Sequence, residues 1–190
     1  HEFPEVIRTT LYGHRPENAA QTSTLDKLSK TINRVKMLRE IVTYNYDDLL
    51  ERMLIDSRAA PVQAVTCGKD LTLLDRSRGD VLMYYVHGRV PSRPGDSPSE
   101  SVVATEGEYH ELRRWDLDWR NLVQLQILTT TRAVFAGLSL NDPNLRWLMK
   151  TCFDETGRVH SAVDLVETTD SVRSQSRKLA GKDCGEDAAA

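Results

Sequence analysis

The chain has 190 residues and a mass of 21.5 kDa, a length that predicts a single domain. Its 25 basic and 28 acidic residues give a net charge of −3, which argues against duplex nucleic acid as the main partner. No stretch of roughly 18 residues is apolar enough to predict a membrane span. Three widely spaced cysteines exclude a disulfide scaffold and a four-cysteine zinc site, and they predict a reducing, cytoplasmic compartment.

The two ends of the chain differ from the rest. The chain begins with His1 instead of methionine and carries no secretion signal, so we expect a fragment or a trimmed chain. Residues 171–190 contain only Val172 and Leu179 as sizeable apolar side chains, too few to offset the entropy of ordering this segment. The sequence therefore predicts one folded domain over residues 1–170 and a disordered tail over residues 171–190.

The first half of the chain alternates helical and extended patterns. Apolar residues recur every three or four positions between Leu25 and Leu38, which predicts an amphipathic helix. Asp47 stands where the cap of a second helix belongs, just before an apolar stripe that starts at Leu50. Runs of apolar, β-branched and aromatic residues predict four strands, of which the second and third are short edge strands: residues 41–44, 61–65, 71–74 and 81–86.

The second half continues the alternation. Prolines and serines predict a loop over residues 91–101, and the apolar spacing that follows predicts a long helix over residues 106–130. Residues 133–136 and 162–166 predict two more strands, and Asp142 followed by proline predicts a helix start between them. Short apolar strands that alternate with amphipathic helices predict an α/β fold, with a mainly parallel sheet covered on both faces.

Polar residues gather where three of the predicted strands end, in residues 43–47, 87–88 and 137–142. Taken singly, each has a structural explanation: Asn45 and Asp47 can end a strand and cap a helix, and His87 can belong to a turn. Parallel strands bring their carboxyl ends to one edge of the sheet, however, and ligands bind at that edge. Together these clusters predict one functional site.

Four segments carry a resemblance to a known family: IVTYNYDDLLE at residues 41–51, YYVHG at 84–88, VVATEGEY at 102–109, and VFAGLSLNDPNLRWLM at 134–149. In their order and spacing they resemble the SIR2-like domain, in particular the prokaryotic branch found in NAD-depleting antiviral defence proteins. The resemblance covers about residues 20–170. It implies a Rossmann-like domain that binds NAD as its substrate and cleaves it to nicotinamide and ADP-ribose.

The resemblance also implies roles for individual residues. His87 matches the catalytic histidine, a base near the ribose hydroxyls, and Asn45 matches the asparagine that holds the nicotinamide ribose. A histidine with a pKa near neutrality suits a general base, and a carboxamide offers donors and an acceptor without adding charge. The residues expected to contact NAD are Thr43, Asn45, Tyr46, Asp47, Gly88, Gly137, Ser139 and Asn141.

Two departures from the sirtuin pattern qualify this expectation. Deacylating sirtuins carry a four-cysteine zinc module, whereas residues 88–136 contain no cysteine, so we expect no zinc and favour water as the acceptor. The family also begins with a strand and a glycine-rich turn that cradles the pyrophosphate, but Gly13 is the sole glycine in the first 67 residues. We therefore expect a Rossmann-like domain that is missing its N-terminal glycine-rich unit.

Two other functions stay open at this point. The same site could serve a protein deacylase or ADP-ribosyltransferase that uses another acceptor, and the domain could be a non-catalytic module that binds NAD or ADP-ribose. Defence proteins of this family often form homo-oligomers or carry an adjoining sensor domain, which the resemblance extends to this chain as an expectation about partners.

Overall fold

The structure is a computed structural model of the chain. It describes residues 3–13, 23–35, 37–57, 61–74, 80–93, 96–99, 102–103, 105, 107–108, 118–138, 142–157 and 161–163. The described elements are, in chain order, α1 (Phe3–Tyr12), α2 (Ser23–Arg34), β1 (Glu40–Thr43), α3 (Leu49–Asp56), β2 (Val62–Val65), the 3-10 helix η1 (Asp70–Thr72), β3 (Val81–Tyr85), α5 (Trp119–Thr130), β4 (Val134–Ala136), α6 (Pro143–Thr156) and β5 (Ser161–Val163).

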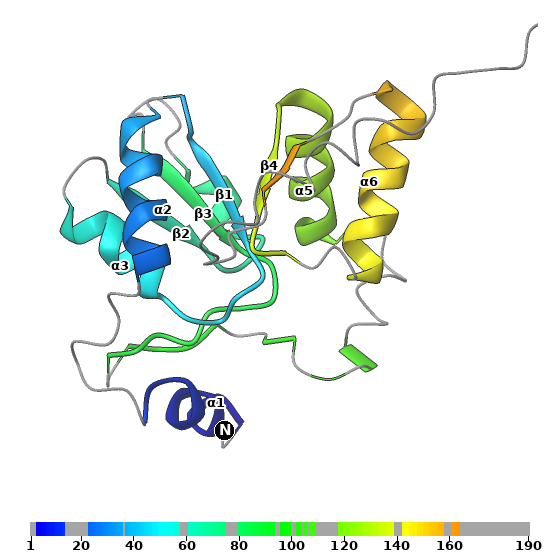
Figure 1. Ribbon diagram of the computed structural model, residues 1–190. Coiled ribbons are helices and arrows are strands. Elements are labelled where there is room, and N and C mark those ends of the chain that lie inside the picture. The colour runs from blue at the N-terminus through cyan, green and yellow to red at the C-terminus, as the bar shows by residue number, and fades with distance from the viewer. Residues whose placement is uncertain are drawn as a thin grey trace, which may run out of the picture.

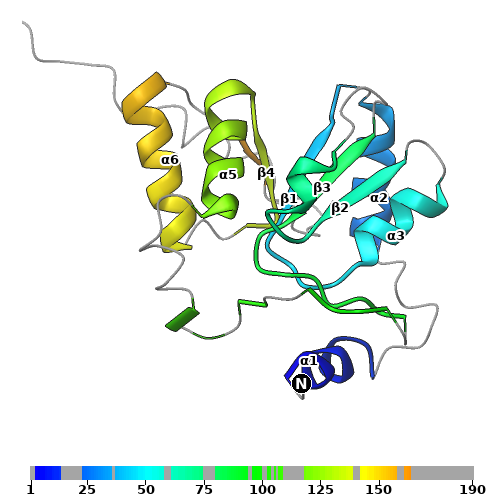
Figure 2. The same cartoon turned by 180° about the vertical axis from the view of Figure 1, so that it is seen from behind.

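The strands form two parallel groups. One sheet has the order β1–β3–β2, and β4 pairs with β5, with every pairing parallel. Helices α2 and α3 lie on one side of the strands and α5 and α6 on the other, as two opposite views show (Figures 1 and 2). This arrangement confirms the predicted α/β, Rossmann-like fold with a mainly parallel sheet.

The core of the larger sheet forms around β3, whose five residues are all buried. A strand covered on both faces needs apolar side chains at consecutive positions, and the run from Val81 to Tyr85 supplies them. On one face Leu82 and Tyr84 pack with Val123 of α5 in a single apolar cluster. The turn that carries His87 follows directly after this buried strand.

Aspartate side chains accept hydrogen bonds from backbone amides at the starts of three described helices, and two of these aspartates, Asp47 and Asp142, were predicted from the sequence. Asp142 accepts a hydrogen bond from the Leu145 amide at 2.8 Å, with proline at the first helical position of α6. Asp118 accepts a hydrogen bond from the Arg120 amide at 2.8 Å at the start of α5. At α3 the cap residue is Asp48, and the carboxylate of its neighbour Asp47 accepts the amide hydrogen bond. Each bond satisfies an amide that the helix itself leaves unpaired.

Two predicted elements differ from the structure. Residues 71–74 do not form a strand: the carboxylate of Asp70 accepts hydrogen bonds from the amides of Thr66 and Cys67, which folds the chain into η1. The helix predicted over residues 106–130 is not continuous, because Asp118 has extended backbone angles and α5 begins after it. Residues 109–117 and the predicted tail lie outside the described residues.

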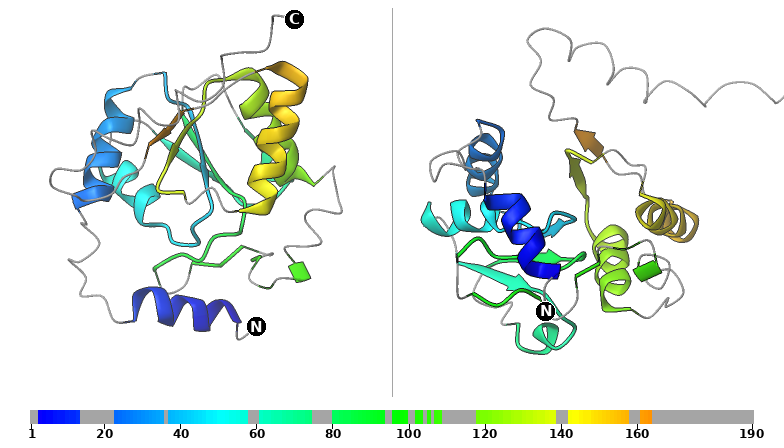
Figure 3. Two further views of the ribbon diagram at one scale, coloured as in Figure 1. Left: turned by 45° about the vertical axis from the view of Figure 1, so that its right-hand side comes forward. Right: turned by 90° about the horizontal axis from the view of Figure 1, so that it is seen from below.

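Helix α1 was not predicted from the sequence. It lies apart from the other helices, beside the segment that follows β3 (Figure 3), and its Tyr12 hydroxyl donates a hydrogen bond to the carbonyl of Val90 at 2.9 Å. In the described part of the chain that precedes β1, the backbone forms two helices and no strand. None of the described helices is both long enough and apolar enough to cross a membrane.

Candidate functional site

The candidate site lies where β1 and β3 end side by side. The last residues paired between these parallel strands are Thr43 and Tyr85. Two positions further along each segment come Asn45 and His87, so the two predicted catalytic residues follow neighbouring strands at the same edge of the sheet. This edge is where parallel α/β sheets place their ligands.

His87 is half-buried between two tyrosines. Its ring lies 5.0 Å from that of Tyr44, centroid to centroid and nearly perpendicular, and 6.4 Å from that of Tyr46. Burial lowers the pKa of His87 below its ordinary value; the carboxylate of Asp142 and a hydrogen bond with the Tyr44 backbone oppose this shift, and the charge of Arg120 adds to it. The imidazole is therefore mostly neutral at pH 7 and able to accept a proton.

The segment that contains Val103 packs against the two segments that contain Tyr46 and His87. The amide of Val103 donates a hydrogen bond to the carbonyl of His87 at 2.8 Å, and the hydroxyl of Tyr46 donates one to the carbonyl of Val103. The amide of Val90 also donates to the carbonyl of Tyr46 at 2.8 Å. Segments that are distant in the sequence thus enclose the turn that carries His87.

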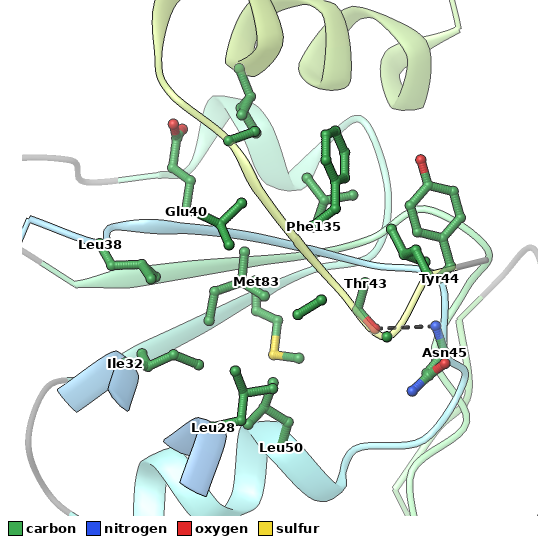
Figure 4. Close-up of a pocket in the computed structure, with 18 of the residues that line it drawn as sticks. Leu28, Ile32, Leu38, Glu40, Thr43, Tyr44, Asn45, Leu50, Met83 and Phe135 are labelled. Carbon is green, nitrogen blue, oxygen red and sulfur yellow. Dashed lines mark hydrogen bonds between the residues drawn. The ribbon is translucent and has the colours of Figure 1, made fainter. Parts of the chain in front are cut away.

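Asn45 is exposed at the end of β1, unlike His87. Its backbone amide donates a hydrogen bond to the Thr43 hydroxyl at 3.1 Å (Figure 4). Asp47 follows, and its carboxylate accepts the Leu49 amide at 3.2 Å. The structural explanation for Asp47 therefore holds, and one of its oxygens is engaged in ending the loop at α3.

A cavity of about 580 Å³ opens beside Asn45. It runs between α2 and β1 on one side and β4 with α5 on the other, and most of its lining is apolar. Figure 4 shows Thr43 and Asn45 close together at one end of the wall, and the carboxylate of Glu40 away from them. His87 is not among the described residues that line it. Polar and small lining residues from the predicted set are Thr43, Asn45, Asp47 and Gly137.

The two glycines of the predicted set adopt backbone angles that favour glycine. Gly88 has a φ of 94° and Gly137 a φ of 66°, in the left-handed region where a side chain is strained. A side chain at Gly137 would meet nothing within 4 Å, so its requirement is conformational. Ser139 and Asn141, which the resemblance assigns to the same loop as Gly137, lie outside the described residues.

Tyr44 belongs to the environment of His87, but it was not among the residues predicted to contact NAD or to act in catalysis. Its hydroxyl donates a hydrogen bond to the side chain of Gln124, a buried residue of α5. Burial raises its pKa, and the carboxylate of Asp142 raises it further. Tyr44 lies between Thr43 and Asn45, which were both predicted to contact NAD. This position in the sequence could have identified it.

Among the described residues, no group of three or more histidine, cysteine, aspartate or glutamate side chains is arranged to hold a metal ion.

A comparison with family models finds a match to the SIR2-like domain over residues 39–184. The match includes β1, the His87 turn and Gly137. A search of curated proteins finds no match to the chain.

Proposed function

The chain belongs to the SIR2-like domain family, whose members use NAD, and we propose that it is an NAD glycohydrolase. The proposed reaction breaks the bond between the nicotinamide nitrogen and C1′ of the ribose. Water supplies the new C1′–O bond, nicotinamide leaves with the electron pair of the broken bond, and one proton is released. The products are nicotinamide and ADP-ribose. Because the four sequence segments resemble NAD-depleting defence proteins of prokaryotes, we propose that the reaction serves antiviral defence.

His87 is proposed as the general base. A neutral imidazole can take a proton from the entering water or from a ribose hydroxyl as positive charge builds on the sugar. The burial that lowers its pKa keeps this form populated at neutral pH. A base within reach contributes roughly 10²–10⁴-fold to such a step.

Asn45 is proposed to orient the ribose. Its carboxamide is exposed at the sheet edge and borders the cavity, so it can donate and accept hydrogen bonds with sugar hydroxyls. Gly137 and Ser139 are assigned to the adenosine half, and Asn141 is proposed as a further residue that contacts NAD. Thr43, Tyr46, Asp47 and Gly88 complete the proposed binding residues.

The observation that carries this proposal is the equivalent placement of Asn45 and His87. They stand two residues beyond a paired position at the ends of adjacent parallel strands, one exposed and one half-buried with a lowered pKa. A base and a neutral hydrogen-bonding group on one edge suit cleavage of a glycosidic bond without a metal ion.

The test is incubation of the purified full-length protein with NAD and chromatographic measurement of nicotinamide and ADP-ribose. We expect both products in equal amounts, with turnover reduced about 10²–10⁴-fold in His87→Ala. Asn45→Ala should reduce turnover and weaken binding. Half-exposed Asp26 pairs with Lys30 on α2 and is not among the described residues that line the cavity, so Asp26→Asn serves as the control that retains activity.

Other outcomes distinguish the alternatives. An O-acyl-ADP-ribose product or labelled protein would indicate a deacylase or an ADP-ribosyltransferase. NAD binding by a folded protein that releases no nicotinamide would identify a non-catalytic module and overturn the proposal.

A further inference from the structure

The turn that carries His87 is fastened on both sides to one carboxylate. Tyr85, two residues before His87, donates its hydroxyl to Glu51 at 2.7 Å. Arg89, two residues after it, donates from Nε at 2.8 Å and from Nη2 at 3.1 Å to the two oxygens of Glu51. Between them the Gly88 amide donates to the Tyr85 carbonyl at 3.1 Å and closes the turn.

This arrangement is buried. Tyr85 is 0% and Glu51 7% exposed, and the Arg89 guanidinium lies 5.8 Å from the centroid of the Tyr85 ring. A carboxylate is costly to bury unless it is paired and hydrogen-bonded. A two-point arginine–carboxylate contact restricts geometry more than a single bond does. These contacts therefore restrict the orientation of the chain on both sides of His87.

The same helix also holds the next part of the chain. Asp48 stands one helical turn before Glu51 and is 1% exposed. Its carboxylate accepts the Ser92 amide at 3.2 Å and lies 3.9 Å from Arg89. Because α3 begins directly after the loop that contains Asn45, it connects this loop with the turn of His87.

We propose that Glu51 is a positioning residue, which orients the His87 imidazole by holding Tyr85 and Arg89 on either side of it. Its effect on NAD turnover rests on the proposed function. Its effect on the imidazole does not, and can be measured in the absence of NAD.

The test is an NMR titration of His87 in the full chain and in Glu51→Gln. The substitution removes the charge and half of the acceptors that fasten the turn. Among the described residues, the rings of Tyr44 and Tyr46 lie against His87, and the charges of Asp142 and Arg120 act on it. Because these remain, we expect the titration midpoint of His87 to move upward as the looser turn admits water.

If the proposed function holds, kcat should fall by as much as roughly 10²-fold, as expected for a displaced catalytic group, with KM for NAD less affected. Leu148→Ala is the matched control, since Leu148 is 0% exposed in a separate apolar cluster. It should lower stability and leave the midpoint of His87 unchanged. Arg89→Lys keeps the positive charge but cannot make the two-point contact of a guanidinium with the Glu51 carboxylate. It should move the titration midpoint of His87 in the same direction as Glu51→Gln.

An unchanged His87 midpoint in folded Glu51→Gln would overturn the proposal. If Glu51→Gln does not fold, the His87 midpoint is measured in Arg89→Lys instead, and an unchanged value there would overturn the proposal. If the parent protein shows no NAD turnover, the proposed function fails, while the NMR midpoint still decides the role of Glu51.

Discussion

The half-buried imidazole of His87 gives a pH dependence with a definite sign. Burial lowers its pKa below the ordinary value of 6.5, so the neutral base persists to lower pH than a solvent-exposed histidine would allow. We expect kcat/KM for NAD to be constant at neutral pH and to fall on acidification, with a midpoint below 6.5. Initial rates of nicotinamide release across this range would measure it; an acid limb above 6.5 would contradict the assignment.

The same shift predicts how His87 affects stability. Its pKa is lower in the folded than in the unfolded chain, so the unfolded chain binds the proton more readily. This group should therefore destabilise the fold as the pH falls through the unfolded value, and have no such effect at higher pH. Urea unfolding of the parent and of His87→Gln at two pH values would isolate the contribution, which should vanish in the variant.

Tyr44 separates the packing around His87 from its hydrogen bonding. In Tyr44→Phe the ring beside His87 remains, but the side-chain oxygen of buried Gln124 loses its donor, at a cost of about 1–3 kcal/mol in the free energy of unfolding. In Tyr44→Ala the ring is lost as well, and the pKa of His87 should rise as water enters. Urea unfolding and NMR titration would measure these effects, and equal His87 midpoints in both variants would contradict this account.

Helices and strands are predicted best from the sequence where the local pattern and the tertiary environment favour the same structure. The fully buried strand β3 is a continuous apolar run, and α6 begins at the predicted aspartate–proline pair. Residues 71–74 have strand-like composition, but the side-chain bonds of Asp70 decide their backbone. A composition pattern contains no information about such a bond.

The candidate site divides in the same way. The alternating pattern predicts parallel strands, which place Asn45 and His87 at one edge of the sheet. That β1 and β3 are also neighbours is seen only in the structure. The arrangement around Glu51 does not, because it joins residues 34 and 38 positions apart. The one feature of the sequence that relates to this arrangement is the spacing of Asp48 and Glu51, which places them on one face of a helix.

Asp142 acts both on helix α6 and on His87. It caps α6 through the Leu145 amide, and its charge raises the pKa of His87. Asp142→Asn should keep the cap, because asparagine caps as well as aspartate, yet lower the pKa of His87. Asp142→Ala should lower that pKa and also cost about 0.5–2 kcal/mol of stability. NMR titration and urea unfolding would separate the two; equal stability loss in both variants would show that the charge, and not the cap, matters.

The cavity lies between the two groups of strands. Its lining comes from α2 and β1 and also from β4 and α5. The residues predicted to bind the two halves of NAD, Asn45 and Gly137, are both part of that lining. A ligand that touches both would join the two groups of strands.

Binding of NAD should therefore stabilise the protein as one unit. A ligand at about 100 times its dissociation constant adds about 2.7 kcal/mol to the free energy of unfolding, which for a chain of this size raises Tm by roughly 5–10 °C. His87→Ala is the suitable protein for a thermal melt, because substrate then persists while the surfaces near Asn45 and Gly137 are intact. Adding Asn45→Ala to it should reduce the shift. Separate melting of two parts, with only one responding to NAD, would contradict a ligand that connects both.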